Sequence, residues 1–228
     1  MATVVISGAS RGIGLELANQ HVAAGDRVFA MCRTPGSAKA LADLVAANPD
    51  RVSVHGIDVR DDTSAKAAAN EIAADRIDIL YNIAGVTGTI APELESVDWA
   101  IFDDALEVML KGPLRVLQAF LPRLGEGSKV VNLTSQLAAS TWPYGGFYGY
   151  VVAKAGLNRL MRSVAIDIKD RGIIVALIHP GWVQTDMGGP GADITPADSA
   201  RGVREVTTAW TLAETGEFKK WTGEPHPW

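Results

Sequence analysis

The stretch "TVVISGASRGIG" at residues 3–14 decides the fold of this chain. It opens with a short run of apolar, mostly β-branched residues, which is typical of a strand buried on both faces. The run leads directly into Gly8, Gly12 and Gly14, spaced as G-x-x-x-G-x-G. Glycines at a strand–helix junction let the backbone approach a pyrophosphate, which then lies at the amino terminus of the helix. A plain tight turn is the alternative, because the spacing differs from the more common G-x-G-x-x-G.

Further apolar runs follow along the chain, and each is expected to be a strand. They are "RVFAMC" (27–32), "RVSVHGIDV" (51–59), "DILYNIAG" (78–85), "KVVNLTS" (129–135) and "IIVALIHPG" (173–181). The segments between them have helical periodicity. This alternation predicts an α/β fold with one doubly wound parallel sheet of the Rossmann type and helices on both faces.

The chain is expected to form a single domain over residues 1–228. Its tail, "GEFKKWTGEPHPW" (216–228), can add a short final strand. Residues 186–199 are rich in glycine, proline and aspartate, which favours a mobile loop.

Composition excludes several classes of protein. The chain has 228 residues, 47% of them hydrophobic, and a net charge of −5. Neither nucleic acid nor an anionic membrane is therefore expected as the main partner. A single cysteine, Cys32, permits no internal disulfide and fits a cytoplasmic location. We expect no signal peptide, no membrane span and no metal site.

The end of the second predicted strand bears on the type of nucleotide. An NAD enzyme usually places an acid here to hold the ribose hydroxyls, but this chain has Cys32 followed by Arg33. An arginine can pair with a 2′-phosphate through two parallel hydrogen bonds, and Arg11 in the glycine loop is placed to assist. The pattern therefore favours NADP, with NAD possible. The alternative is a solvated arginine after a strand.

Asp58 ends the third predicted strand and has two interpretations. Its carboxylate can accept a hydrogen bond from the adenine amino group, with Val59 packed near the ring. It can equally cap the helix that follows.

Five motifs then occur in a fixed order along the chain. They are "SGASRGIG" (7–14), "NIAG" (82–85), "LTS" (133–135), "YVVAK" (150–154) and "HPGWVQTDMGG" (179–189). Together they resemble the short-chain dehydrogenase/reductase family. The last motif and the "PW" ending are similar to its small carbonyl-reductase branch, which includes the C-factor and sniffer proteins. The resemblance implies hydride exchange between NADP(H) and a small carbonyl or alcohol.

Tyr150 and Lys154 are four residues apart, so they share one face of a helix, whereas Tyr148 points elsewhere if the helix includes it. Such a pair also occurs in ordinary packing. The resemblance implies that Tyr150 is the acid and base. It implies that Lys154 lowers the pKa of Tyr150 and holds a ribose. Ser135 would orient the substrate carbonyl. Thr134 is its rival, although successive strand residues face opposite ways.

The same resemblance implies the residues that contact the cofactor. Asn82, Ala84 and Gly85 would line its ribose side, while Pro180, Gly181 and Thr185 would approach the nicotinamide or the pyrophosphate. The complete expected set is Gly8, Ser10, Arg11, Gly12, Ile13, Gly14, Arg33, Asp58, Val59, Asn82, Ala84, Gly85, Tyr150, Lys154, Pro180, Gly181, Val183 and Thr185.

Two residues depart from the family pattern. Ile83 replaces the second asparagine of Asn-Asn-Ala-Gly, and Met109 replaces an asparagine whose backbone carbonyl holds a water beside the lysine. These departures favour an alternative function, a nucleotide-binding signalling or scaffold protein with weak or no turnover. Intact Ser135, Tyr150 and Lys154 favour the enzyme.

The resemblance also implies an assembly, and the aromatic residues suggest a substrate. Long helices at 98–123 and 154–169 would form the interface of a homodimer or homotetramer. An apolar pocket wall for a small hydrophobic or aromatic carbonyl compound is expected from Trp142, Tyr144, Phe147 and Trp182.

Overall fold

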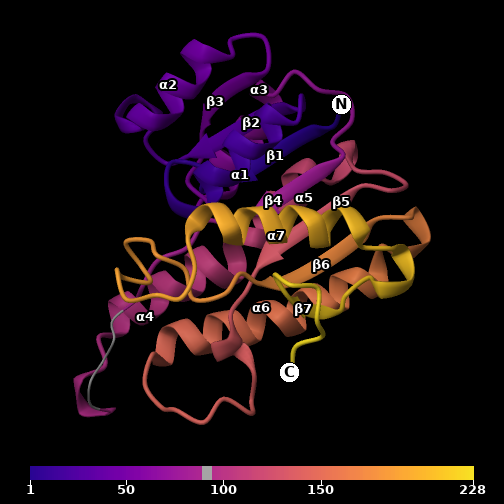
Figure 1. Ribbon diagram of the computed structural model, residues 1–228. Helices are drawn as coiled ribbons and strands as arrows, with labels where there is room; N and C mark the ends of the chain where they lie inside the picture. Colours follow the sequence, from indigo (N-terminus) through magenta and orange to yellow (C-terminus); the bar gives the residue numbers. More distant parts are fainter. Residues whose placement is uncertain (89–93) are drawn as a thin grey trace.

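The computed structural model describes residues 1–88 and 94–228, and its centre is a seven-stranded sheet (Figure 1). The strands are β1 (Thr3–Ser7), β2 (Arg27–Cys32), β3 (Val52–Gly56), β4 (Ile79–Asn82), β5 (Lys129–Leu133), β6 (Ile174–His179) and β7 (Phe218–Lys220). Their order is β3-β2-β1-β4-β5-β6-β7, and all neighbours are parallel. The predicted doubly wound α/β fold is confirmed, and so is the short final strand.

Helices connect the strands. They are α1 (Gly12–Ala23), α2 (Lys39–Ala47), α3 (Asp62–Glu71), α4 (Trp99–Leu106), α5 (Gly112–Phe120), α6 (Tyr148–Asp167) and α7 (Pro196–Ala209). Single 3-10 turns lie at Pro35–Ser37, Leu94–Ser96, Leu121–Arg123, Gln136–Ala138, Lys169–Arg171 and Leu212–Glu214. Within the described ranges, no helix is long and apolar enough to cross a membrane.

An apolar core lies on each face of the sheet. Val5 packs into the core shared with α3, α4, α5 and α6, whereas Val4 and Ile6 pack into the core shared with α1, α2 and α7. All three side chains are completely buried. Each contributes about 1.5–3 kcal/mol by leaving water. Burial of alternate residues on opposite faces explains why β1 is a continuous apolar run.

The direction of chain winding reverses beside β1. The chain moves from β1 through β2 to β3 on one side, and β4 then pairs with the other side of β1. In parallel α/β sheets, ligands bind at such a switch point, outside the carboxyl ends of the strands. The glycine loop follows β1 and therefore lies at this switch point.

Three expected boundaries change in the structure. The segment 98–123 is not one helix, because a π-turn, Glu107–Lys111, separates α4 from α5. Helix α6 begins at Tyr148 rather than at 154. The segment 186–199 is partly helical, because α7 starts at Pro196. Thr195 caps this helix, and its side chain accepts a hydrogen bond from the backbone N–H of Asp198. The prediction of a loop included Pro196 because proline is frequent in loops, but proline is also favoured at the first position of a helix.

A buried histidine at the end of β6 links folding stability to pH. Burial lowers the pKa of His179 to about 4, and the neighbouring charges of His226 and Lys220 add to the effect. In the unfolded chain this side chain titrates near 6.5. The unfolded state therefore binds more protons between these values, and stability falls as the pH falls through this window.

We therefore expect the free energy of unfolding to drop by about 2–3 kcal/mol between pH 6.5 and pH 4.5 because of His179 alone. Urea unfolding at several pH values measures this slope. His179→Gln should flatten the slope, whatever its effect on stability at pH 7. An equally steep slope in that variant would assign the effect to other groups, such as His21, whose pKa burial also lowers.

Candidate active site

A cleft of about 580 Å³ opens at the carboxyl edge of the sheet. Its walls come from the loops after β1 to β5, from the π-turn and α6, and from the segment after β6. It brings together most of the residues predicted to hold a cofactor: Gly8, Ser10, Arg11, Gly12, Ile13, Gly14, Arg33, Asp58, Val59, Ala84, Gly85, Tyr150, Lys154, Pro180 and Thr185. Asn82, Ser135, Gly181 and Val183 do not line it.

The glycine loop, residues 8–14, is a tightly folded cradle in which side chains at two positions would collide with backbone atoms. Gly8 has a φ of +80°, and a Cβ atom there would lie 2.6 Å from the backbone nitrogen of Ala84. A Cβ atom on Gly14 would lie 2.2 Å from the carbonyl oxygen of Gly8. Helix α1 follows immediately, and no side chain caps its amino terminus. Its free backbone N–H groups can bind an anion such as a pyrophosphate.

Basic side chains lie at one end of the cleft. Arg33 is exposed and lines the cleft beside the buried Cys32, where burial raises the pKa of the thiol. Arg11 pairs with Asp186 across the cleft at 2.5 Å, and both side chains are largely exposed. Exposed pairs of this kind stabilise little, so Arg11 can exchange its partner for a phosphate.

Lys154 is the buried charge of the site. The residue is 6% exposed, and its Nζ donates a hydrogen bond to the carbonyl oxygen of Leu133 at 2.7 Å. Burial lowers the pKa of Lys154 to about 8. The ammonium form therefore predominates at neutral pH and is lost above about pH 8.

Tyr150 lies beside this lysine, with Nζ 5.9 Å from the ring centroid. Burial raises the pKa of Tyr150, and a hydrogen bond with Ser135 partly offsets this increase. The expected lowering of the Tyr150 pKa by Lys154 is therefore not what this structure shows. The physical reason is that Nζ is engaged with Leu133 and lies over the ring, while desolvation dominates at the phenol.

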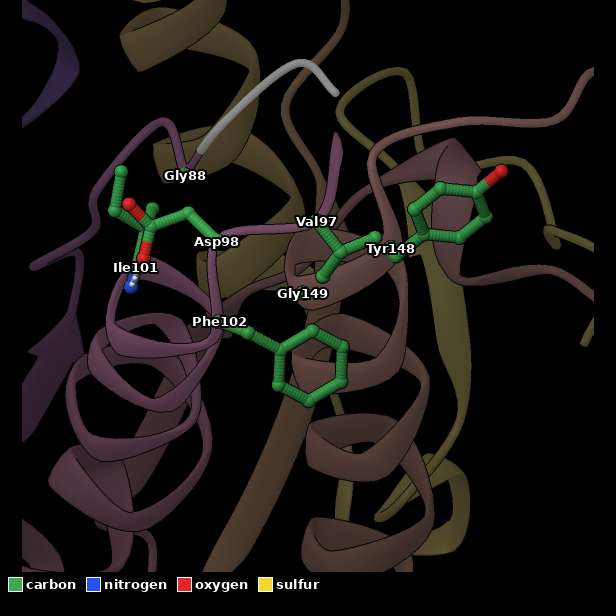
Figure 2. A pocket seen from close by; sticks show the side chains of 7 residues that line it. All are labelled: Gly88, Val97, Asp98, Ile101, Phe102, Tyr148 and Gly149. Carbon is green, nitrogen blue, oxygen red and sulfur yellow. Dashed lines mark hydrogen bonds between the residues drawn. The ribbon is translucent and has the colours of Figure 1, made fainter. Parts of the chain in front are cut away.

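Tyr148 is the first residue of α6 and does not line this cleft. It lines a separate small hollow between the start of α4 and the start of α6. Figure 2 shows its ring pointing away from Asp98 and Phe102, which line the same hollow. Helix α6 thus separates the two tyrosines, and only Tyr150 contacts the lysine.

Ser135 and Thr134 differ in what they contact. The Ser135 hydroxyl accepts a hydrogen bond from the backbone N–H of Leu137 at 3.1 Å. The Ser135 side chain also acts on Tyr150, where it lowers the pKa against the effect of burial. Thr134 lines the cleft, and its buried hydroxyl has no partner among the described residues. Of these two hydroxyls, Ser135 is the one that affects the pKa of Tyr150.

The π-turn places Met109 at the cleft wall. Its sulfur lies 3.7 Å from where a Cβ atom on Gly85 would be. A π-turn inside a helix often marks a functional site. Asn82 instead donates a hydrogen bond to the Asn132 side chain inside the sheet, at 2.9 Å. It therefore supports the cleft without lining it.

Two other residues that were expected to contact the cofactor do not line the cleft but support its wall. Gly181 has a φ of +90°, and a Cβ atom there would lie 2.4 Å from Ile194 Cδ1. Val183 is buried and pairs with Ile194 in an isolated β-bridge. These contacts hold the segment after β6 close to Gly12, where Thr185 lines the cleft.

Sequence reasoning missed part of the lining. The further lining residues include Ile57, Arg60, Val86, Thr87, Val108, Leu133, Gln184, Asp186, Met187 and Pro196. Most of these residues are next to the quoted motifs in the sequence, and this proximity is the one sequence feature that could have identified them. None of the four aromatic residues expected as a pocket wall lines this cleft. Trp142 instead packs edge-on against Tyr144, and the Trp182 indole donates to the Gly188 carbonyl.

Comparison with known proteins identifies the family. The model of the short chain dehydrogenase family matches residues 2–193. This chain belongs to the short-chain dehydrogenase family. The C-signal protein of Myxococcus xanthus is 39% identical over 168 residues, which covers 72% of this chain and 99% of that protein. The 1-hydroxy-2-glutathionyl-2-methyl-3-butene dehydrogenase of Rhodococcus sp. (strain AD45) is 31% identical over the full length of both chains.

Solved structures agree with this assignment. The carbonyl reductase Sniffer of D. melanogaster has a TM-score of 0.94 at 26% identity, with both chains fully covered. The NADPH-bound carbonyl reductase from chicken fatty liver has a TM-score of 0.92 at 29% identity, covering 100% of this chain and 99% of that one. The predicted resemblance to the family and to its C-factor and sniffer branch is confirmed.

Proposed function

We propose that this protein is an NADP(H)-dependent oxidoreductase that interconverts a small carbonyl compound and its alcohol. The contact of Tyr150 with both Lys154 and Ser135, at the wall of a cleft floored by the glycine cradle, carries this proposal. Similar structures include carbonyl reductases solved with NADPH or NADP. An oxidoreductase with a nicotinamide cofactor is the broader assignment, and NADP is the more specific one.

The residues of the cleft fit this cofactor. Gly8 and Gly14 let the loop pack tightly against Ala84 and against itself, and the uncapped start of α1 supplies N–H donors for a pyrophosphate. Arg33 and Arg11 offer guanidinium groups for a 2′-phosphate. Asp58 is ionised beside Arg60, and it does not cap α3 because Asp61 does. This leaves Asp58 for the adenine amino group.

The bound cofactor would supply or accept the hydride, and the chain supplies the proton. We assign Tyr150 as the acid for carbonyl reduction and the base for the reverse reaction. Its raised pKa keeps the phenol protonated at neutral pH, as an acid requires. The Lys154 ammonium stabilises the phenolate left after proton transfer. Ser135 donates to the developing oxyanion from the side of Tyr150.

One domain would then carry both the nucleotide site and the catalytic residues. Exposed apolar side chains on α4 and α6, among them Trp99, Val152 and Ile166, support a homodimer or homotetramer built on these helices. The cytoplasmic location stays a prediction from cysteine content. Met109 and Ile83, which depart from the family pattern, leave open the alternative of a nucleotide-binding protein without turnover. A screen of small aldehydes, ketones and alcohols with NADP(H) would distinguish this alternative from the enzyme.

Tyr150→Phe removes the proton donor while leaving the ring in place. We expect turnover to fall by about 10²–10⁴-fold, the range for a lost general acid. NADPH binding should stay almost unchanged, because the cradle and the basic end are intact. Loss of NADPH absorbance with a carbonyl substrate measures turnover, and fluorescence titration measures binding.

Tyr148→Phe is the matched control, since it makes the same change two residues earlier on the other side of α6. Its effect on turnover should be small. The opposite pattern, a silent Tyr150→Phe and an inactive Tyr148→Phe, would refute the assignment.

Arg33→Ala tests the cofactor preference. Losing a hydrogen bond to a charged group costs about 1.5–3 kcal/mol, so NADPH affinity should fall about 10- to 100-fold while NADH affinity stays the same. Arg51→Ala removes an exposed arginine outside the cleft lining and should change neither affinity. Equal affinities of the wild type for NADPH and NADH would show that Arg33 is a solvated surface residue.

A further inference from the structure

Three charged residues form a connected row from α4 to the nucleotide end of the cleft. Asp104, on α4, accepts two hydrogen bonds from Arg60, from Nε at 2.7 Å and from Nη2 at 3.1 Å. Arg60 in turn donates to Asp58 from its backbone N–H at 3.0 Å and from Nη1 at 3.3 Å. Asp58 and Arg60 both line the cleft, and Asp104 does not.

The contacts on Asp58 are asymmetric. Both hydrogen bonds from Arg60 end on the same oxygen, Oδ1. Oδ2 accepts no hydrogen bond from the residues that the structure describes. The Arg60 guanidinium is planar, and two bonds to Asp104 hold that plane in one orientation. The orientation of the Asp58 carboxylate, and hence the direction of Oδ2, depends on this row.

We propose that Arg60, anchored by Asp104, is a positioning residue for recognition of the nucleotide base. It fixes the Asp58 carboxylate so that Oδ2 accepts a hydrogen bond from the 6-amino group of adenine. This inference rests on the proposed use of NADP(H). A hypoxanthine base has a 6-oxo group, which offers no donor and places an oxygen against the carboxylate. The row therefore determines selection for adenine over 6-oxopurines.

A purely structural row would behave differently. It would only tie α4 to the segment after β3, and breaking it would lower stability and weaken binding of every nucleotide alike. A positioning role instead changes the ratio of affinities for two cofactors that differ only at position 6 of the purine. That ratio is independent of general loosening and of any turnover.

The test is fluorescence titration of NADPH and of its hypoxanthine analogue into the full-length protein. The wild type should bind NADPH about tenfold or more tightly than the analogue, the effect of one hydrogen bond to a charged acceptor. Asp104→Asn and Arg60→Gln should reduce this preference to about twofold, since Oδ2 loses its fixed direction. Asp104→Glu, which keeps the carboxylate, should restore part of it.

Asp103→Asn is the matched control, because it removes the same charge from an exposed neighbouring position on α4. It should leave the preference at the wild-type value. Thermal unfolding of each variant shows whether it is folded. An unchanged preference in folded Asp104→Asn and Arg60→Gln would overturn the positioning role while leaving the proposed function intact. Failure of the wild type to bind NADPH at all would overturn the proposed function itself.

Discussion

The hydrogen bond from the Lys154 ammonium to the Leu133 carbonyl is the interaction on which the proposed catalytic end of the cleft depends. A nearly buried ammonium must be hydrogen-bonded, because an unpaired charge in the interior is costly. This bond satisfies one of its three donors and ties α6 to the end of β5. Tyr150, one turn earlier on α6, is thereby held beside Ser135, two residues after Leu133. Lys154 also lines the cleft, so its other two donors are available to the ribose and water of the proposed function.

The proposed nucleotide end of the cleft depends on a different constraint, the close approach of backbone segments in and around the glycine loop. Gly8 lies so close to Ala84, and Gly14 so close to Gly8, that any side chain would displace the backbone. Sheet topology brings these segments together, because β1 and β4 are neighbours at the switch point. One sheet edge thus presents a cradle at one end and a buried lysine–tyrosine pair at the other. The proposed proton-transfer and cofactor-binding roles can therefore be tested by separate mutations.

Patterns that repeat along the chain were readable from the sequence, and those that depend on close packing were not. Runs such as "TVVIS" identify strands buried on both faces, and the spacing of Tyr150 and Lys154 identifies a shared helix face. The π-turn at Glu107–Lys111 has no periodic signature, since one extra residue per turn changes the contacts and not the composition. Asn82, Gly181 and Val183 belong to the expected motifs but act from behind the cleft. Whether a motif residue lines a cleft depends on neighbours distant in sequence, such as Asn132 and Ile194.

In the free protein, burial dominates the acidity of Tyr150 and raises its pKa. We expect a bound cofactor to reverse part of this increase. An oxidised nicotinamide brings a positive charge into the cleft, which favours the phenolate. The most direct measurement is an NMR titration of ring-labelled tyrosine, assigned with Tyr150→Phe, with and without NADP⁺. The account predicts a Tyr150 pKa above the ordinary tyrosine value in the free protein and a clear decrease when NADP⁺ is bound. A Tyr150 pKa at or below the ordinary value in the free protein, unchanged by NADP⁺, would contradict it.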